Sequence, residues 1–340
     1  MLTFIRQILR WVEGGSLKLL TLAGLILLVW GTVAPVGTLV WWLQQGAESL
    51  GLPKKQPGEL PPRANVNPRA EAAGIDCYIV FLPGVGDFSA DQLTDGEAVF
   101  LNRLVKTHHN CVAVGDVFPY SAANESLGGR RLLAPLWHFA DNADGWLKNA
   151  DVLIKIRNLW RFAIAVDDRY GPIYNQGTAT AIIDRMNAAH PLPRSPQQPL
   201  KVILIGTSGG AQVALGAATY LDQWLNARIT VLSIGGVFAG EEGFQASRSV
   251  YHLQGTRDWL EDLGPVMFPS RWPWTVTSSF NQARLRGRYE VYNSGPHTHD
   301  GSEGYFGTDI APTTGITYVE LTLQQVNRLP IWSDHGSDQK

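Results

Sequence analysis

The stretch from residue 201 to residue 218 constrains the fold more than any other part of this 340-residue chain. It opens as a run of aliphatic residues, breaks at the five residues GTSGG (206–210), and continues as small and apolar residues at helical spacing. This order predicts a buried strand, a tight turn and a helix. Gly206 and Gly210 lie two positions before and after Ser208, so no Cβ atom there hinders the close approach of strand and helix. We therefore expect Ser208 at the tip of a strained turn, just before a helix N-terminus.

Strands alternate with helices on both sides of this turn. The first predicted helix opens with the capping-box pattern Thr94-Asp-Gly-Glu97 and separates two apolar strands. Strands that alternate with helices in this way form a mostly parallel sheet flanked by helices, so the sequence predicts the α/β fold class for residues 74–330. The predicted strands, besides the one that precedes Ser208, are 77–82, 111–118, 228–234, 249–254 and 288–293, and the last helix is 317–328.

Chemically reactive side chains follow the predicted strands. Besides Ser208, Asp258 comes shortly after the strand 249–254, and His297 and His299 come just beyond the last strand. The carboxyl ends of parallel strands lie at one edge of the sheet, where ligands bind in open α/β folds. A serine hydroxyl needs a histidine base at neutral pH, and that histidine needs a carboxylate to fix its tautomer. We therefore expect a catalytic serine with Asp258 as the acid; His299 is the favoured base because it stands further from a proline, and His297 is the alternative.

With these residues, the chain from Cys77 to Arg328 resembles the α/β-hydrolase superfamily, in particular its lipases, esterases and thioesterases. The superfamily places its nucleophile in a G-x-S-x-G elbow and has the chain order serine, acid, histidine. The segments that carry the resemblance are Gly206-Thr-Ser-Gly-Gly210, Leu82-Pro-Gly-Val-Gly86, Gly255-Thr-Arg-Asp258 and the late histidine loop.

The resemblance implies a role for each of these segments. Ser208 would be the nucleophile, and the oxyanion hole would use the N–H of Gly209 and an N–H of the Gly84-Val85 turn. The implied activity is cleavage of a carboxylic ester or thioester, lipid esters included, through an acyl-enzyme. Two alternatives stay open. One is acyl transfer to a lipid or peptidoglycan acceptor by the same triad, and the other is a non-catalytic α/β-hydrolase-like scaffold that binds a partner or a lipid through its aromatic-rich insertion at residues 119–199.

An insertion is predicted at residues 119–199, before the serine turn. It is rich in Trp, Tyr and Phe and contains two helical patterns, at about 143–167 and 177–189. Aromatic side chains serve packing and pockets alike, so two interpretations stay open. The insertion either packs beside or over the active-site edge or supplies extra core helices that flank the sheet.

The N-terminal region predicts attachment to a membrane. Residues 1–18 form a basic amphipathic lead-in, and the 25 residues from Leu19 to Leu43 carry no charge and end in Trp41-Trp42. About 20 such residues span a bilayer as a helix, and Trp favours the interface. We expect a single-pass transmembrane anchor at 19–45 and a Pro-rich linker at 46–73. The basic lead-in favours a cytoplasmic N-terminus, which places the soluble domain on the non-cytoplasmic side.

Composition limits the other partners and cofactors. A net charge of −2 gives no electrostatic argument for nucleic acid binding. The His297-Thr-His299 pair lacks a third ligand at suitable spacing, so we expect neither a metal nor a cofactor. Cys77 and Cys111 are each the first residue of a predicted strand. A disulfide between them is one possibility, but two buried thiols are the expected state. Residues 331–340 are predicted to be a disordered tail.

Overall fold

The computed structural model describes residues 75–85, 93–119, 150–167, 170–192, 199–240 and 243–332, and the side chains of the third range from residue 158 onward. These residues belong to one compact unit, Pro57–Lys340. The predicted lead-in, anchor and linker, and most of the predicted tail, lie outside the described residues. Within those ranges, no helix combines the length and the apolar character needed to cross a bilayer.

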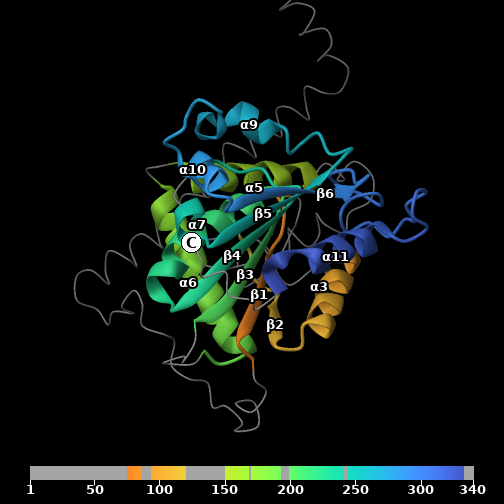
Figure 1. The fold of residues 1–340 in the computed structure, drawn as a ribbon, viewed down its shortest axis with the longest axis horizontal. Coiled ribbons are helices and arrows are strands. Elements are labelled where there is room, and N and C mark those ends of the chain that lie inside the picture. Colours follow the sequence, from red (N-terminus) through yellow and green to blue (C-terminus); the bar gives the residue numbers. More distant parts are fainter. Residues whose placement is uncertain are drawn as a thin grey trace, which may run out of the picture. The chain divides into compact units, whose positions relative to one another are not determined.

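A six-stranded parallel sheet lies at the centre of this unit, in the strand order β2-β1-β3-β4-β5-β6 (Figure 1). The chain adds β2 on one side of β1, then crosses to β3 on the other side and continues outward from there. The loops after β1 and β3 therefore diverge at a topological switch point, which is where ligands bind in open α/β sheets. The strands are β1 (Cys77–Leu82), β2 (Cys111–Val114), β3 (Leu200–Thr207), β4 (Ala227–Ile234), β5 (Ser249–Gly255) and β6 (Tyr289–Gly295).

Helices cover both faces of the sheet (Figure 1). Successive side chains of a strand point to opposite faces, and in β1 the even-numbered residues pack with α6 and α7 while the odd-numbered residues pack with α3 and α11. Every residue of β1 is buried, which explains its continuous apolar sequence. The helices are α3 (Asp95–Thr107), α5 (Ala150–Val166), α6 (Gly171–Ala189), α7 (Gly210–Trp224), α8 (Gly243–Ala246), α9 (Leu263–Met267), α10 (Ser279–Leu285) and α11 (Tyr318–Arg328), with short 3₁₀ helices η3 (Pro269–Arg271) and η4 (Pro330–Trp332).

The predicted α/β class is confirmed, and two element boundaries within the described residues differ from the prediction by more than two residues. The capping box is present, because the Thr94 side chain accepts from the Glu97 N–H while the Glu97 carboxylate accepts from the Thr94 N–H at 2.8 Å. The second strand ends at Val114 rather than at 118, since its pairing with β1 stops there. The helix predicted from 177 begins at Gly171 instead, with a proline in its first turn, where the missing N–H costs no helical hydrogen bond.

The two described helices of the predicted insertion do different things. Helix α6 contributes Ala179, Ile182 and Met186 to the same apolar cluster as β1 and α7, so it is a core helix. Helix α5 packs against α6 and α7, and its buried Asn158 donates to the Val85 carbonyl at 2.8 Å. Each of the two interpretations of the insertion thus fits one helix: α6 flanks the sheet, and α5 supports the loop that follows β1.

Cys77 and Cys111 form a disulfide, so the expectation of two buried thiols is wrong. Both are the first residues of their strands, and the parallel register pairs them directly. Side chains at paired positions of neighbouring strands point to the same face, which brings the two sulfur atoms together. The sequence showed where the two strands begin but not that they lie side by side in this register.

Removing this disulfide with the double substitution Cys77→Ala/Cys111→Ala should lower the free energy of unfolding. The bridge joins residues separated by 34 positions, and freeing a loop of that size in the unfolded chain costs about 2–4 kcal/mol of stability. Urea unfolding of the oxidised wild type and the double variant measures the difference, and the reduced wild type should resemble the variant. Equal stability of all three samples would contradict the bridge.

Candidate active site

Ser208 lies at the tip of the turn between β3 and α7 in a strained conformation. Its φ of 49° makes it the single non-glycine residue with positive φ among the described residues. This left-handed conformation costs an L-residue about 1–2 kcal/mol. The Ser208 N–H donates to the Ile234 carbonyl at 3.2 Å, and the Ser208 carbonyl accepts from the Val237 N–H at 3.0 Å. The last residue of β4 and the loop that follows it therefore hold the strained serine in place, as strain persists only where the surroundings fix it.

Glycines let three elements meet at Ser208. A Cβ atom on Gly206 would lie 2.5 Å from Ala211 Cα, and one on Gly210 would lie 2.2 Å from the Leu82 carbonyl oxygen. Both distances are far below ordinary contact, so the predicted close approach of strand and helix is confirmed. A Cβ on Gly84 would be 3.2 Å from the Cβ of Ser208, which brings the loop after β1 against the serine as well.

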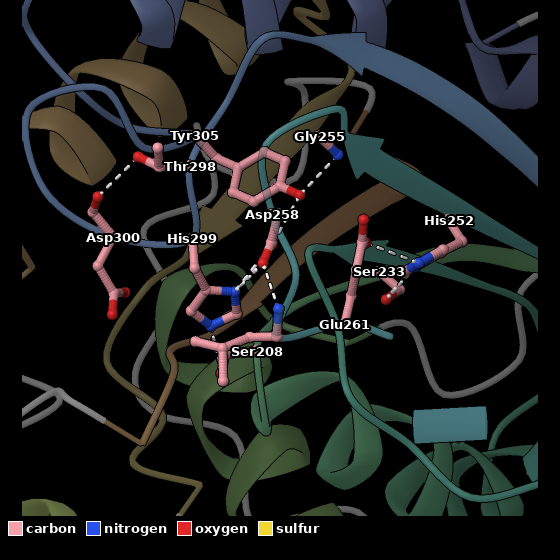
Figure 2. A network of polar contacts seen from close by, with 11 residues as sticks. Ser208, Ser233, His252, Gly255, Asp258, Glu261, Thr298, His299, Asp300 and Tyr305 are labelled. Atoms are coloured by element: carbon pink, nitrogen blue, oxygen red, sulfur yellow. Dashed lines mark hydrogen bonds and ion pairs between the residues drawn. The ribbon is translucent and has the colours of Figure 1, made fainter. Parts of the chain in front are cut away.

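Ser208, His299 and Asp258 form one hydrogen-bonded array (Figure 2). The Ser208 Oγ is 3.0 Å from His299 Nε2, and His299 Nδ1 is 2.8 Å and 3.0 Å from the two Asp258 oxygens. An ionised carboxylate only accepts, so Nδ1 carries the proton and Nε2 accepts from the serine hydroxyl. The Asp258 side chain is fully buried and the His299 side chain is 9% exposed. The loops after β3, β5 and β6 thus bring the three predicted residues together.

The alternative base, His297, lies outside this array. It is fully buried, its Nε2 is 2.9 Å from the Ser294 carbonyl, and its ring stacks on Tyr305 with the centroids 4.9 Å apart. Burial lowers the pKa of His297, so it is neutral at pH 7 and its Nε2–H donates to Ser294. Of the two late histidines, the structure therefore brings only His299 against the serine.

Asp258 has two further hydrogen-bond donors that the sequence did not indicate. One carboxylate oxygen accepts from the Leu260 N–H at 3.0 Å, and the other accepts from the Tyr305 hydroxyl at 2.9 Å. The Tyr305 oxygen in turn accepts from the Gly255 N–H at 2.9 Å. Tyr305 stands 47 positions from Asp258 in a loop without regular spacing, so no sequence pattern linked the two.

The electrostatics of the array favour a basic His299. Burial disfavours its charged form, but the hydrogen bond with Asp258 and the negative charges of Asp258 and Asp300 outweigh burial, so the pKa of His299 is raised above its ordinary value. A histidine with a raised pKa holds a proton more readily. This property suits a group that takes a proton from a serine hydroxyl.

A second buried polar cluster lies beside the first, also outside the sequence predictions (Figure 2). Ser233 Oγ is 2.9 Å from His252 Nδ1, and His252 Nε2 is 3.1 Å from a Glu261 oxygen. Burial and the nearby Asp258 charge raise the pKa of Glu261 to about 8, while burial and the charge of Arg271 lower the pKa of His252 to about 3. The three side chains are closed to solvent, and the raised pKa of Glu261 favours its uncharged form at pH 7, which reduces the negative charge beside Asp258.

Backbone donors are available next to Ser208. The N–H groups of Gly209, Gly84 and Val85 donate to no acceptor within the part of the chain that the structure describes. Gly209 precedes the first residue of α7, and a helix N-terminus favours negative charge. The residues expected to form an oxyanion hole therefore have N–H groups that a bound oxygen could use.

The fold and the site define the class of protein: a parallel α/β protein with a serine–histidine–aspartate array at the carboxyl edge of its sheet. None of the protein-family models searched matches the chain, and no curated protein matches it. No group of three or more His, Cys, Asp or Glu side chains in the described ranges is arranged to hold a metal ion.

The raised pKa of His299 is testable without a substrate. Replacing Asp258 with Asn removes the negative charge that favours the imidazolium form of His299. Burial is then the largest influence on the His299 pKa, which should fall below its ordinary value of about 6.5 instead of exceeding it. NMR titration of the ring nitrogens measures both values. Asp262→Asn, four positions along the chain, is the control and should leave the titration as in the wild type. An unchanged His299 pKa in the Asp258→Asn variant would contradict the assignment.

Proposed function

We propose that this protein is a serine hydrolase of the α/β-hydrolase superfamily that cleaves a carboxylic ester or thioester. The observation that carries the proposal is the continuous hydrogen-bonded path from Ser208 through His299 to Asp258. Its support includes the strained turn at Ser208, the position of that turn at the switch point of a parallel sheet, and the chain order serine, acid, histidine.

In the first half of the reaction, the serine attacks the substrate carbonyl. His299 Nε2 takes the hydroxyl proton as the Ser208 oxygen forms a bond to the carbonyl carbon, and Asp258 stabilises the resulting imidazolium. The N–H of Gly209 and an N–H of the Gly84-Val85 turn donate to the oxyanion. When the intermediate collapses, the leaving alkoxide or thiolate takes the proton from His299, and the acyl group remains on Ser208 as an ester.

In the second half, a water molecule replaces the leaving group. His299 accepts a proton from the water as the water oxygen attacks the acyl carbon. The same N–H groups, of Gly209 and the Gly84-Val85 turn, donate to the second oxyanion. Collapse returns the proton to the Ser208 oxygen and releases the carboxylic acid. An alcohol in place of the water would give acyl transfer, so product analysis with competing alcohols separates hydrolysis from transfer.

A fluorophosphonate probe tests the nucleophile, since it bonds to a serine that a histidine activates. The wild-type chain should be labelled and the Ser208→Ala variant should not, with hydrolysis of a p-nitrophenyl ester reduced on the order of 10⁴- to 10⁶-fold. The control is Ser249→Ala, at the opposite end of the sheet on β5, which should behave as the wild type. Equal labelling of the Ser208→Ala variant would refute Ser208 as the nucleophile, whereas absence of labelling from both chains would favour the non-catalytic scaffold.

The protein is further proposed to be anchored in a membrane, with its catalytic domain on the non-cytoplasmic side. Support comes from the uncharged segment 19–43, from the basic residues before it, and from the disulfide between Cys77 and Cys111. Structural disulfides persist in oxidising compartments and are rare in the cytosol. The anchor would hold the site close to a bilayer, which is compatible with a lipid ester as substrate.

Cell fractionation and thiol trapping test this placement together. The full chain should stay with membranes after an alkaline carbonate wash, whereas a chain lacking residues 1–45 should not, because the apolar segment holds it there. A membrane-permeable alkylating reagent added before lysis should leave Cys77 and Cys111 unmodified. Their modification in intact cells would contradict an oxidising compartment.

A further inference from the structure

The Tyr305 hydroxyl occupies a position that neither the sequence pattern nor the proposed reaction assigns. It lies between Asp258 and the backbone N–H of Gly255, at 2.9 Å from each (Figure 2). We infer that Tyr305 is a positioning residue. Its hydroxyl donates to the Asp258 carboxylate and in this way affects how strongly Asp258 stabilises the charged form of His299. The inference rests on the proposed function, because its effect is on the base of that reaction.

The direction of the hydroxyl proton follows from the partners. A backbone N–H can only donate, so the Tyr305 oxygen must accept from Gly255. The single hydroxyl proton is then left for Asp258, which as a carboxylate only accepts. Burial raises the pKa of Tyr305 above its ordinary value, so the hydroxyl keeps its proton throughout the range in which His299 titrates.

The Tyr305 ring is fixed on several sides. Its backbone carbonyl accepts from the buried Thr322 hydroxyl at 2.7 Å, and its face stacks on His297 with an angle of 16° between the rings. A Cβ atom on Gly235 would lie 2.4 Å from the ring edge, which shows how closely the chain packs there. His297, the histidine that the array does not use, thus serves as a platform for Tyr305.

The hydrogen bond from Tyr305 sets how strongly Asp258 holds the imidazolium. Tyr305 and His299 donate to the same Asp258 oxygen, so the two donors share its negative charge. Without the hydroxyl, more of that charge would act on His299 and would raise its pKa further. The Gly255 N–H would also lose its acceptor, and the loop that carries Asp258 would be held less firmly.

Tyr305→Phe tests the inference in the full-length chain, because it keeps the ring and removes only the hydroxyl. The rate of fluorophosphonate labelling of Ser208, measured from pH 5 to 7.5, reports the fraction of neutral His299. Glu261, whose pKa is raised to about 8, is mostly protonated over this window. We expect the labelling rate of Tyr305→Phe to rise at a higher pH than that of the wild type, and its maximal labelling rate to be about tenfold lower. The probe concentration that gives half-maximal labelling should be the same in both proteins.

Tyr292→Phe is the matched control. The Tyr292 hydroxyl donates to Glu290 on the same strand, away from Asp258, so its loss should leave the pH dependence and the rate as in the wild type. A purely structural role for Tyr305 would lower the melting temperature of Tyr305→Phe but leave the pH dependence of labelling unmoved. That result would overturn the inference.

A second substitution keeps the test valid if Tyr305→Phe does not fold. Incorporation of 3-fluorotyrosine at position 305 retains the shape of the side chain and makes its hydroxyl a stronger donor. The rise of the labelling rate should then move to lower pH, opposite to the Phe variant. Unchanged pH dependence in the fluorinated protein overturns the role of Tyr305, provided that Ser208→Ala is not labelled. Labelling of Ser208→Ala at the wild-type rate overturns the proposed function instead.

Discussion

The left-handed backbone of Ser208 is the constraint on which the rest of the site depends. A non-glycine residue keeps a φ of 49° only where its surroundings leave no alternative. The surroundings include the close contact of β1, β3 and α7, which the missing side chains of Gly206 and Gly210 permit. They also include two backbone hydrogen bonds, one with the last residue of β4 and one with the loop that follows it. The packing of the sheet core therefore offsets the free-energy cost of the strained Ser208 conformation.

Parallel strands explain why residues far apart in the chain meet at this serine. Ser208 and His299 are 91 positions apart, and Asp258 and His299 are 41 apart, yet each follows a strand that ends at the same edge. The loop after β1 reaches the same point because the strand order reverses between β1 and β3. Asp258 faces His299, and hydrogen bonds from the Leu260 N–H and the Tyr305 hydroxyl support its negative charge.

The fold class and the principal site residues were accessible from sequence for physical reasons. Strands buried on both faces have continuous apolar sequences, and the carboxyl ends of parallel strands converge, so Ser208, Asp258 and a late histidine could be assigned to one edge. Side-chain direction within an irregular loop has no such periodicity. The choice of His299 over His297 was therefore only a preference, and Tyr305 was missed.

Lateral register was equally hidden from the sequence. The disulfide depends on Cys77 and Cys111 being paired neighbours, and the Ser233–His252–Glu261 cluster depends on β4 and β5 lying side by side. Apolar runs predict that strands exist but not which positions face each other. Both features became visible only once the strand order was known.

The central claim is that Ser208 carries the acyl group of the substrate during turnover. Rapid mixing of the full-length chain with an excess of an activated ester, acid quenching within milliseconds and peptide mass spectrometry measure this directly. The account predicts a mass increase of one acyl group on the peptide that contains Ser208, which appears before steady-state product and is absent from Ser208→Ala. Turnover without an adduct, or an adduct on another residue, would contradict it.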